Sequence, residues 1–376
     1  MASFASMQFS AVPAVPSPGY EGAGVQEATM TKFRPDVSRG IRKPSGKRAT
    51  LKTISELTGL SLSTVSLSLR GGASLKEETR QKVAEAAAQV GYVPDRAGVR
   101  LRTGKTNVIA LVLDGSDEAI DFSRHMIRGI GDAISGTRYH LTVMPDFDRS
   151  RSVETVRYIL ENRTADGVII THTGARDRRV QLMMDHDFPF VSHGRTEFFT
   201  PHAFHDFHSE AFAELAVERL ADNGARDILI SVGDGTTNNY HNIIRTFERT
   251  IARRGITGRV VVQDGIRPAS AEMRQFGRDL ADKPDRPDGI ICDSETRAIS
   301  MLCGLEDGGV PLGRDIRFIC KQTSDILSTV FPNVDTIEED VYAAGLELTR
   351  LLLRRIEGEP AESLQTLSEP VAHWRS

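Results

Sequence analysis

The segment 50–72, TLKTISELTGLSLSTVSLSLRGG, determines how the rest of this chain is interpreted. Its pattern predicts two short helices joined by a tight turn. In the first helix, Leu51, Ile54 and Leu57 recur at helical spacing and are expected to face inward. Gly59 is placed where the turn needs a left-handed backbone, which glycine adopts without steric cost. The segment therefore predicts a compact helical pair.

The second helix of the pair is expected to begin at Ser61, whose hydroxyl can accept hydrogen bonds from the free N–H groups of the first turn. Val65 and Leu69 lie four residues apart and would pack on the first helix. The other face carries short side chains that suit a DNA major groove; they are Ser63, Thr64, Ser66 and Leu67. Taken alone, the segment also fits an ordinary helical hairpin with a serine-rich surface.

Charge is distributed unevenly along the 376 residues, which leave room for two to three domains. The whole chain has a formal net charge of −4. Between Lys47 and Lys105, however, eleven basic residues face five acidic ones. A basic module on an acidic protein favours phosphate contact by one end of the molecule.

The composition also limits the compartment and the class of protein. Cys292, Cys303 and Cys320 lack metal or redox spacing and lie in apolar runs, which predicts buried thiols and a reducing cytoplasm. No apolar run is long enough for a membrane helix, and the N-terminus is a poor signal peptide. A cytoplasmic protein without a membrane partner is expected.

The first 46 residues are rich in Ala, Ser, Pro and Gly and are expected to be disordered. Met30 precedes a basic run, so translation starting at Met30 is an alternative to Met1. A third helix is predicted over 77–90, ended by Gly91. Residues 47–93 are therefore assigned to the helix-turn-helix domain, and the short basic segment 94–105 to a hinge and linker.

From Asn107 onward, apolar strands alternate with amphipathic helices. This pattern predicts parallel sheets covered on both faces, hence an α/β fold. Two such sets indicate two doubly wound lobes in residues 106–370, with a ligand cleft at the carboxyl ends of the strands. The strands are expected at 107–115, 139–147, 165–173, 188–194, 227–234, 258–264, 288–294 and 315–322, and the helices at 123–135, 153–162, 178–185, 210–223, 242–254, 296–307 and 341–357.

These segments resemble the LacI/GalR family of bacterial transcription regulators. The resemblance rests on segment 50–72, on LKEETRQKV, on GYVPDRAGVRLRTGKTNVIALV, and on MIRGI, ADGVII, AELAVERL and PDGIIC in lobes that are periplasmic-binding-protein-like. It covers about residues 48–370. It implies a homodimer that binds pseudo-palindromic operator DNA. The dimer is expected to respond to a small-molecule effector, commonly a sugar or polyol, and to act as a repressor.

The resemblance also assigns DNA contacts. It places Thr50 and Leu51 near phosphates, and Leu62, Ser63 and Leu67 at base-reading positions beside Ser61, Thr64 and Ser66. Many relatives have arginine where this chain has Leu67. Leucine offers only apolar contact, for example to a thymine methyl, so an operator that differs from the family consensus is expected. Arg70 lies just beyond and is expected either to contact a phosphate or to compensate in part for the missing arginine.

The hinge is assigned in the same way. Leu101 matches the leucine that the family wedges into the minor groove, where an apolar side chain unstacks one base step and bends the duplex. Arg100 and Arg102 would supply positive charge beside it. Closure of the cleft on a ligand would shift the two hinge segments of a dimer and so change DNA affinity.

For the effector cleft, the resemblance implies ten residues at or near ligand positions: Phe122, Arg195, Asp206, Tyr240, Asn242, Ser294, Glu295, Lys321, Gln322 and Glu339. An aromatic face with carboxylates and amides suits a sugar, whereas Lys321 leaves an anionic metabolite open. The histidines near the strand ends match no standard metal pattern, so no metal is expected; they are His172, His193, His202, His205 and His208.

Two other classes of protein compete with a regulator. A solute-binding protein for sugar uptake would need a signal peptide and no basic helical module. An enzyme would need a catalytic motif, but no GxGxxG after a strand, P-loop or nucleophile elbow is present. No catalytic residues and no cofactor are therefore expected. The sequence does not identify the effector, its direction of action, the operator, or a dimer as against a tetramer.

Overall fold

The computed structural model describes residues 49–69, 75–92, 100, 103–114, 120–146, 152–233, 235–263 and 270–375. The chain divides into two compact units, Met1–Val93 and Pro94–Ser376. Predictions for the extension 1–46, and for Arg70, Leu101 and Arg102, concern residues outside the described part of the chain. Within that part, every helix is too short or too polar to cross a membrane.

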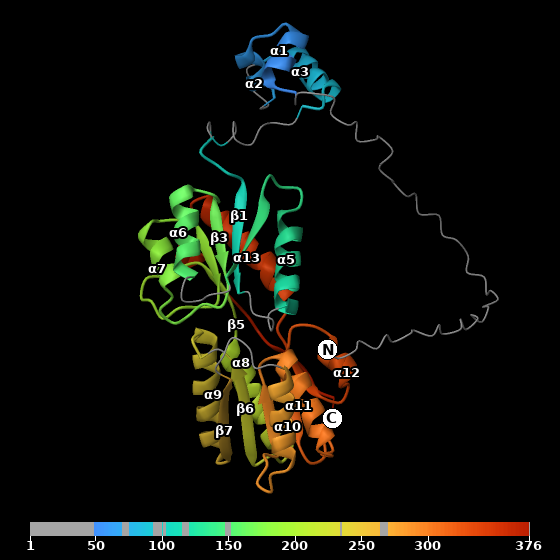
Figure 1. The fold of residues 1–376 in the computed structure, drawn as a ribbon. Coiled ribbons are helices and arrows are strands. Elements are labelled where there is room, and N and C mark those ends of the chain that lie inside the picture. Colours follow the sequence, from blue (N-terminus) through green and yellow to red (C-terminus); the bar gives the residue numbers. More distant parts are fainter. Residues whose placement is uncertain are drawn as a thin grey trace, which may run out of the picture. The chain divides into compact units, whose positions relative to one another are not determined.

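The first unit is built from α1 (Leu51–Thr58), α2 (Leu62–Ser68) and α3 (Glu77–Gln89) (Figure 1). Gly59 ends α1 in the left-handed region, at φ 71°, as predicted. The Ser61 hydroxyl caps α2 by accepting a hydrogen bond from the Thr64 N–H at 3.2 Å. Local signals thus define both ends of the turn.

The core of this unit forms where the three helices meet. Ile54, Val65 and Val83 are completely buried there. The prediction that Leu57 faces inward is wrong, because its side chain is 53% exposed. The buried stripe of α1 passes through Ile54 and Thr58, and consecutive residues of a helix lie about 100° apart around its axis. Leu57 is thereby turned to the surface.

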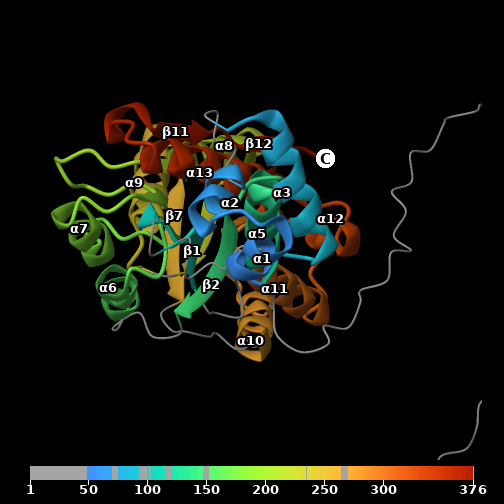
Figure 2. The same ribbon diagram turned by 90° about the horizontal axis from the view of Figure 1, so that it is seen from above.

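The first lobe of the second unit has a six-stranded sheet in the order β11-β5-β4-β3-β1-β2. Helices α5 (Ile120–Ile134) and α13 (Val341–Ile356) pack on one face, and α6 (Ser152–Asn162) and α7 (Arg178–Asp185) on the other (Figures 1 and 2). The strands are β1 (Val108–Asp114), β2 (His140–Asp146), β3 (Gly167–Ile170), β4 (Phe190–His193), β5 (Phe204–Phe207) and β11 (Gln365–Ser368).

The second lobe repeats this plan, with a sheet in the order β12-β10-β9-β8-β6-β7. Helices α8 (Ser209–Asp222) and α9 (Asn238–Arg254) cover one face, and α10 (Ser270–Ala281), α11 (Glu295–Asp307) and the short α12 (Ile326–Val330) the other. The strands are β6 (Asp227–Gly233), β7 (Thr257–Gln263), β8 (Gly289–Cys292), β9 (Arg317–Gln322), β10 (Asp335–Glu338) and β12 (Val371–His373). A short 3-10 helix covers Ala361–Ser363.

These sheets confirm the predicted fold class and add elements that the pattern did not reveal. The additions are α10, α12 and the strands β5, β10, β11 and β12, none of the strands longer than four residues. β12 pairs antiparallel with β10, so the second sheet is mixed and extends past residue 370. Of the cysteines, Cys292 and Cys320 are buried as predicted, whereas Cys303 is only half-buried.

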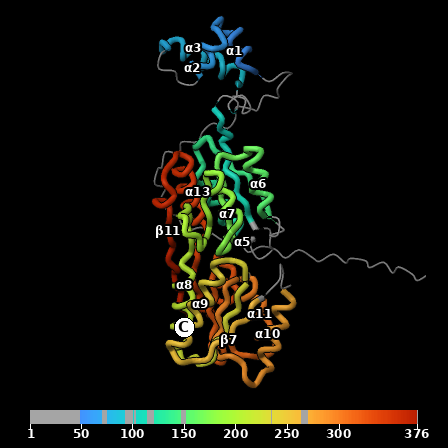
Figure 3. The backbone as a smooth tube through the Cα atoms, turned by 90° about the vertical axis from the view of Figure 1, so that its left-hand side faces the viewer, coloured from blue at the N-terminus to red at the C-terminus, as the bar shows by residue number. Residues whose placement is uncertain are grey.

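Three connections between the lobes lie in the described part of the chain. They run from β5 to α8, from β10 to α13 and from β11 to β12. Helix α13 and strand β11 therefore belong to the first lobe although they follow most of the second lobe in the chain (Figure 3). The carboxyl ends of the parallel strands in both sheets lie at these connections. The strand ends of the two lobes therefore surround a shared junction.

Close helix crossings depend on glycine in both lobes. A Cβ placed on Gly129 of α5 would collide with the Tyr342 carbonyl oxygen and lie 3.1 Å from the Cα of Gly345 on α13. In the second lobe, Gly277 of α10 and Gly304 of α11 face each other's backbone in the same way. Backbone atoms cannot move aside as a flexible side chain can, so these crossings require the glycines.

We predict that Gly129→Ala lowers the free energy of unfolding by about 1–3 kcal/mol, as overpacking does in other cores. Gly131, two residues along the same helix, has nothing within 4 Å of its Cβ position. Gly131→Ala should instead stabilise the protein by about 0.5–1 kcal/mol, because alanine favours a helix. Urea denaturation of both variants measures the difference; equal midpoints would contradict the account of the crossing.

Candidate DNA-binding face and ligand cleft

The exposed face of α2 carries the residues predicted to contact DNA. Ser61, Leu62 and Ser63 are exposed, whereas Thr64, Ser66 and Leu67 are half-buried. Leu62 is 52% exposed. Opposite this face, Val65 anchors the helix in the core. α2 therefore presents a narrow surface of small hydroxyl groups and one apolar side chain.

Several hydroxyl groups on this surface already have partners. Ser61 Oγ lies 2.7 Å from Ser63 Oγ and 2.9 Å from Thr64 Oγ1. At the start of α1, Thr50 and Thr53 form a reciprocal capping box, in which the backbone N–H of each is bonded to the other's hydroxyl. Leu51, next to Thr50, is half-buried in the core. These hydroxyls fix the two helix ends as well as facing outward.

Arg100 lies at the start of the second unit and contacts the first lobe. Its guanidinium donates a hydrogen bond to the Asn162 carbonyl oxygen at 2.9 Å. Asn162 is the last residue of α6, where the helix dipole favours a positive charge. The structure thus places Arg100 on the first lobe, while Arg70 and Leu101 fall outside the described residues.

A pocket of about 630 Å³ lies at the carboxyl ends of the first-lobe strands. Asp146 ends β2 there, His172 follows β3, and the start of α6 forms another wall. Thr236 reaches the pocket from the second lobe, after β6. The volume is in the range of small-molecule sites, and the position agrees with the predicted cleft.

The two lobes are joined beside this pocket by main-chain contacts. Gly174 and Thr237 form an isolated antiparallel bridge. The Asn238 N–H donates to the Thr173 carbonyl at 2.9 Å, and the Asn238 amide donates to the Arg195 carbonyl at 3.2 Å. The start of α9 is therefore attached to the loops that follow β3 and β4.

A buried charge cluster lies at the same junction. Glu339 follows β10, and its carboxylate lies 2.7 Å from Lys321 Nζ of β9 and 3.5 Å from His193 Nε2 of β4. Burial opposes the charge of both groups, but Lys321 holds the pKa of Glu339 below its usual value and Glu339 raises the pKa of Lys321. Burial lowers the pKa of His193 to about 4, so this ring is neutral at pH 7.

Phe122 links this cluster to the pocket. Its ring meets His172 edge-on at 5.6 Å between centroids, and His193 in the same manner at 5.3 Å. His172 lines the pocket and His193 belongs to the charge cluster. The structure therefore brings together Phe122, Lys321 and Glu339 from the predicted set, immediately behind the pocket wall.

Arg195 forms a second charge cluster. Its Nε donates to Asp206 at 2.7 Å, and the other end of the guanidinium pairs with both oxygens of Glu210 at 2.8 and 2.9 Å. Asp206 is buried, and that desolvation outweighs Arg195 and raises the Asp206 pKa to about 6. Two of the predicted residues thus pair with each other, and Glu210, which was not predicted, joins them.

The remaining predicted residues make separate local contacts. Glu295 accepts hydrogen bonds from the Thr323 N–H and from the hydroxyls of Thr323 and Ser324. Ser294 caps α11, and Asn242 accepts from Arg245 at 2.6 Å. Tyr240 packs edge-on against its neighbour His241. Gln322 is buried at the end of β9.

None of the ten predicted effector residues is among those that line the pocket. The lining includes Asp146, Asp177, Arg179 and Thr236, which the sequence did not single out. Their only sequence signal is that each follows or approaches the carboxyl end of a strand. Among the described residues, His, Cys, Asp and Glu form no group that could hold a metal ion.

The two parts of the chain match two different family models. Residues 50–95 match the model "Bacterial regulatory proteins, lacI family", and residues 217–376 match "Periplasmic binding protein-like domain". The helical unit with its exposed α2 and the two lobes with a pocket at their junction therefore define the class of protein: a DNA-binding module joined to a ligand-binding body.

Curated relatives agree along most of the chain. The regulator AglR of Rhizobium meliloti is 26% identical over 81% of this chain and 86% of its own length. The regulator RafR of Escherichia coli is 28% identical over 85% of this chain and 96% of its own. Both are named HTH-type transcriptional regulators, as is the more distant CelR of Thermobifida fusca.

Solved structures share the fold. The lac repressor dimer bound to operator and the anti-inducer ONPF superposes with a TM-score of 0.75 at 19% identity, covering 88% of this chain and 98% of that one. The CelR–cellobiose complex gives 0.63 at 21% identity, covering 87% and 99%. Together these findings show that the chain carries a lacI-family DNA-binding domain followed by a periplasmic-binding-protein-like domain, and that it is similar to HTH-type transcriptional regulators along most of its length.

We predict that Lys321→Met lowers the free energy of unfolding at pH 7 by about 3–5 kcal/mol, because it leaves a buried carboxylate without its main partner. The loss should be smaller near pH 5, where Glu339 can take up a proton. The double variant Lys321→Met/Glu339→Gln removes both charges and should recover most of the stability. Urea denaturation at the two pH values measures these effects; a single variant as stable as wild type would contradict a buried pair.

We also predict that Leu62→Ala weakens DNA binding by about 1–3 kcal/mol while leaving the fold intact, because the exposed Leu62 is expected to become buried against a base edge. Leu57→Ala removes an equally exposed leucine from α1 and serves as the control. Fluorescence anisotropy with a selected operator measures both. Equal losses from the two variants would show that exposed apolar area in general, rather than the α2 surface, determines affinity.

Proposed function

We propose that this chain is a transcription regulator that binds operator DNA as a homodimer and changes its DNA affinity when a neutral, hydroxyl-rich ligand binds between its lobes. The observation that carries the proposal is the combination of an exposed α2 face with a lobe junction in which buried charges are already paired. Repression is the expected mode, and DNA binding places the protein in the cytoplasm.

The ligand class follows from the charges at the cleft. Each of four cations beside it is held by a carboxylate: Arg179 by Asp177, Arg195 by Asp206 and Glu210, Arg297 by Asp293, and Lys321 by Glu339. An anionic ligand would have to compete with these carboxylates, and in the pocket it would meet Asp146, Glu154 and Asp177 as well as Arg157, Arg178 and Arg179. A neutral sugar or polyol avoids both costs, so the pairing of Lys321 weighs against an anionic metabolite.

Buried polar atoms point to the same ligand. His193 Nε2, Asn238 Oδ1 and Gln322 Oε1 are inaccessible to solvent and have no hydrogen-bond partner among the described residues. Buried polar atoms that lack partners are rare, and the hydroxyl groups of a ligand that reaches past the pocket wall would donate or accept the missing hydrogen bonds. The printed names of relatives are consistent with this class, since one similar structure is a CelR–cellobiose complex.

We also propose a function for each segment of the chain. Residues 47–93 read the operator, 94–105 form the hinge, and 106–370 bind the effector and dimerise. In the hinge, Leu101 enters the minor groove as an apolar wedge, with Arg100 and Arg102 supplying charge. Leu62, Ser63 and Leu67 read bases, and the apolar Leu67 makes the operator differ from sites read by arginine.

A solute-binding role without regulation is not supported, because a lacI-family DNA-binding domain precedes the lobes and the relatives are regulators. The same relatives are not enzymes by name. We extend this to the present chain and expect no turnover of any sugar that binds, which incubation followed by product analysis would check.

We predict that neutral saccharides raise the melting temperature and that their matched uronic acids do not. Each pair shares a ring and differs by one carboxylate, so the comparison isolates charge. A ligand at a hundred times its Kd stabilises a protein by about 2.7 kcal/mol, which a thermal-shift screen detects easily. His172→Ala removes a pocket wall and should reduce the shift.

The opposite preference, with the acids stabilising and the neutral sugars inactive, would overturn the assigned ligand class. Retention of DNA binding in the same preparation separates failure of the ligand assignment from failure of the regulator assignment.

A further inference from the structure

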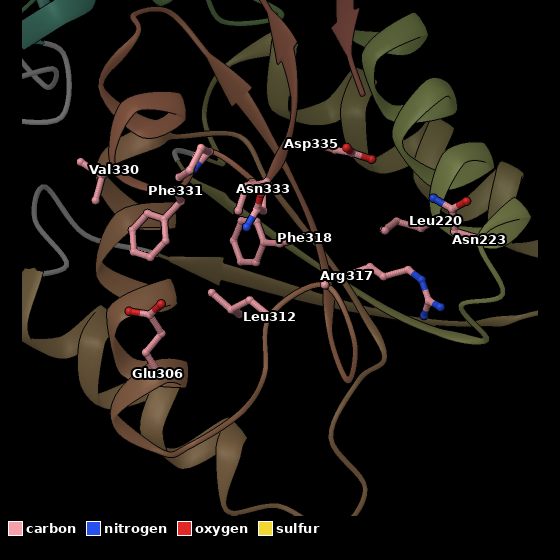
Figure 4. A pocket seen from close by; sticks show the side chains of 13 residues that line it. Leu220, Asn223, Glu306, Leu312, Arg317, Phe318, Val330, Phe331, Asn333 and Asp335 are labelled. Atoms are coloured by element: carbon pink, nitrogen blue, oxygen red, sulfur yellow. The ribbon is translucent and has the colours of Figure 1, made fainter. Parts of the chain in front are cut away.

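A second pocket, of about 530 Å³, lies in the second lobe (Figure 4). Its apolar floor is formed by Leu220 of α8, Phe318 of β9, and Phe331 and Val334, all of them buried. A volume of this size holds a small organic molecule with one or two rings. The floor therefore suits a ligand with an aromatic or aliphatic body.

This pocket is separate from the ligand cleft. Arg317 and Asp335 stand at the amino ends of β9 and β10, whereas Gln322 and Glu339 stand at or just beyond the carboxyl ends. Five residues of extended chain separate Arg317 from Gln322, a distance of about 16 Å. A molecule bound at Arg317 would therefore occupy a site other than the cleft.

The polar side chains that line the pocket are Asn223, Glu306, Arg317, Asn333 and Asp335, and Arg317 is the cation among them. Arg317 is half-buried and has no ion-pair partner among the described residues. In Figure 4 its side chain extends away from Phe331 and Glu306, toward the side of the pocket formed by Leu220 and Asn223. Asn223, at the end of α8, adds an amide group close to this side.

The buried carboxylate nearby does not neutralise Arg317. One oxygen of Asp335 accepts from Arg219 Nε at 2.9 Å, and the other accepts from the Arg375 N–H at 2.6 Å. Glu306, the other acidic side chain of the lining, is exposed and stands across the pocket in Figure 4. The pocket thus combines an apolar floor with one available guanidinium at its edge.

We propose that this pocket is a second ligand site, which takes an amphipathic carboxylate whose apolar body covers Phe318 and Phe331 and whose carboxylate pairs with Arg317. A guanidinium matches a carboxylate in geometry and can donate two parallel hydrogen bonds to it. The apolar body supplies affinity because the body itself leaves water when it packs against this floor. The site does not depend on the identity of the cleft ligand.

The probe for this site is 3-phenylpropanoate, titrated calorimetrically into the full-length protein. We expect saturable binding to wild type, and binding weaker by about tenfold for 3-phenylpropan-1-ol, which has the same body without the charge. Arg317→Gln should weaken binding of the carboxylate to the same degree and leave the affinity for the alcohol unchanged. Arg314→Gln removes an exposed charge three residues away and should bind like wild type.

Any of three results would overturn the proposal. The first is no saturable binding of 3-phenylpropanoate up to about 10 mM, a concentration range that still detects affinities near −3 kcal/mol. The second is equal affinity of wild type and Arg317→Gln for this carboxylate, and the third is an equal loss of its affinity in Arg314→Gln. Sedimentation of both variants checks that the oligomeric state is unchanged. A shift in oligomeric state confined to Arg317→Gln, without an effect on the probe, would assign the pocket to contact between copies of the chain and contradict a ligand site.

Discussion

The carboxylate of Glu339 is the point on which the lobe junction depends. It is buried after β10 and lies between Lys321, from the sheet of the second lobe, and His193, from the sheet of the first. A charge in such a place is tolerated only while it is paired. Its cationic partner Lys321 belongs to the same lobe, whereas the neutral His193 ring belongs to the other, so any relative movement of the lobes changes the distance from Glu339 to His193. Ligand binding and the electrostatics of the junction are thereby connected.

Each lobe is tightly packed where two of its helices cross. In each, two helices cross so closely that glycine is required, Gly129 with Gly345 and Gly277 with Gly304. Tightly packed interiors deform little, so a change in the cleft is expected to act through the three connections between the lobes rather than within either lobe. One of these connections leads from Glu339 directly into α13, which packs on α5.

Much of the fold was predictable because its signals are local. The Ser61 cap, the left-handed Gly59 and the long apolar strands each depend on a few adjacent residues, and the structure confirms them. The misplacement of Leu57 shows the limit of a short helix, in which two different stripes fit the same spacing. The four-residue strands β5, β10 and β11 and the three-residue β12 depend on pairing with distant segments, so their own residues carry little signal.

The site was less predictable than the fold. Family resemblance led to Phe122, Arg195, Asp206, Lys321 and Glu339, and the structure groups them in networks behind the pocket wall. The lining residues, such as Asp146 and Thr236, come from different lobes and meet only through the folded chain. No spacing in the sequence encodes that proximity. The DNA-binding face was easier, since α2 is one continuous segment.

The central claim is that the cleft and the DNA-binding face are coupled through the body of the protein. Coupling of two binding equilibria is reciprocal, so a ligand and DNA must change each other's affinity by the same factor, commonly about 5–150-fold. The most direct measurement is a pair of titrations with one saccharide and one operator fragment, by anisotropy for DNA and by calorimetry for the saccharide. We predict that the saccharide changes operator affinity by the same factor by which the operator changes saccharide affinity. A saccharide that binds tightly in the cleft while operator affinity stays constant would contradict it.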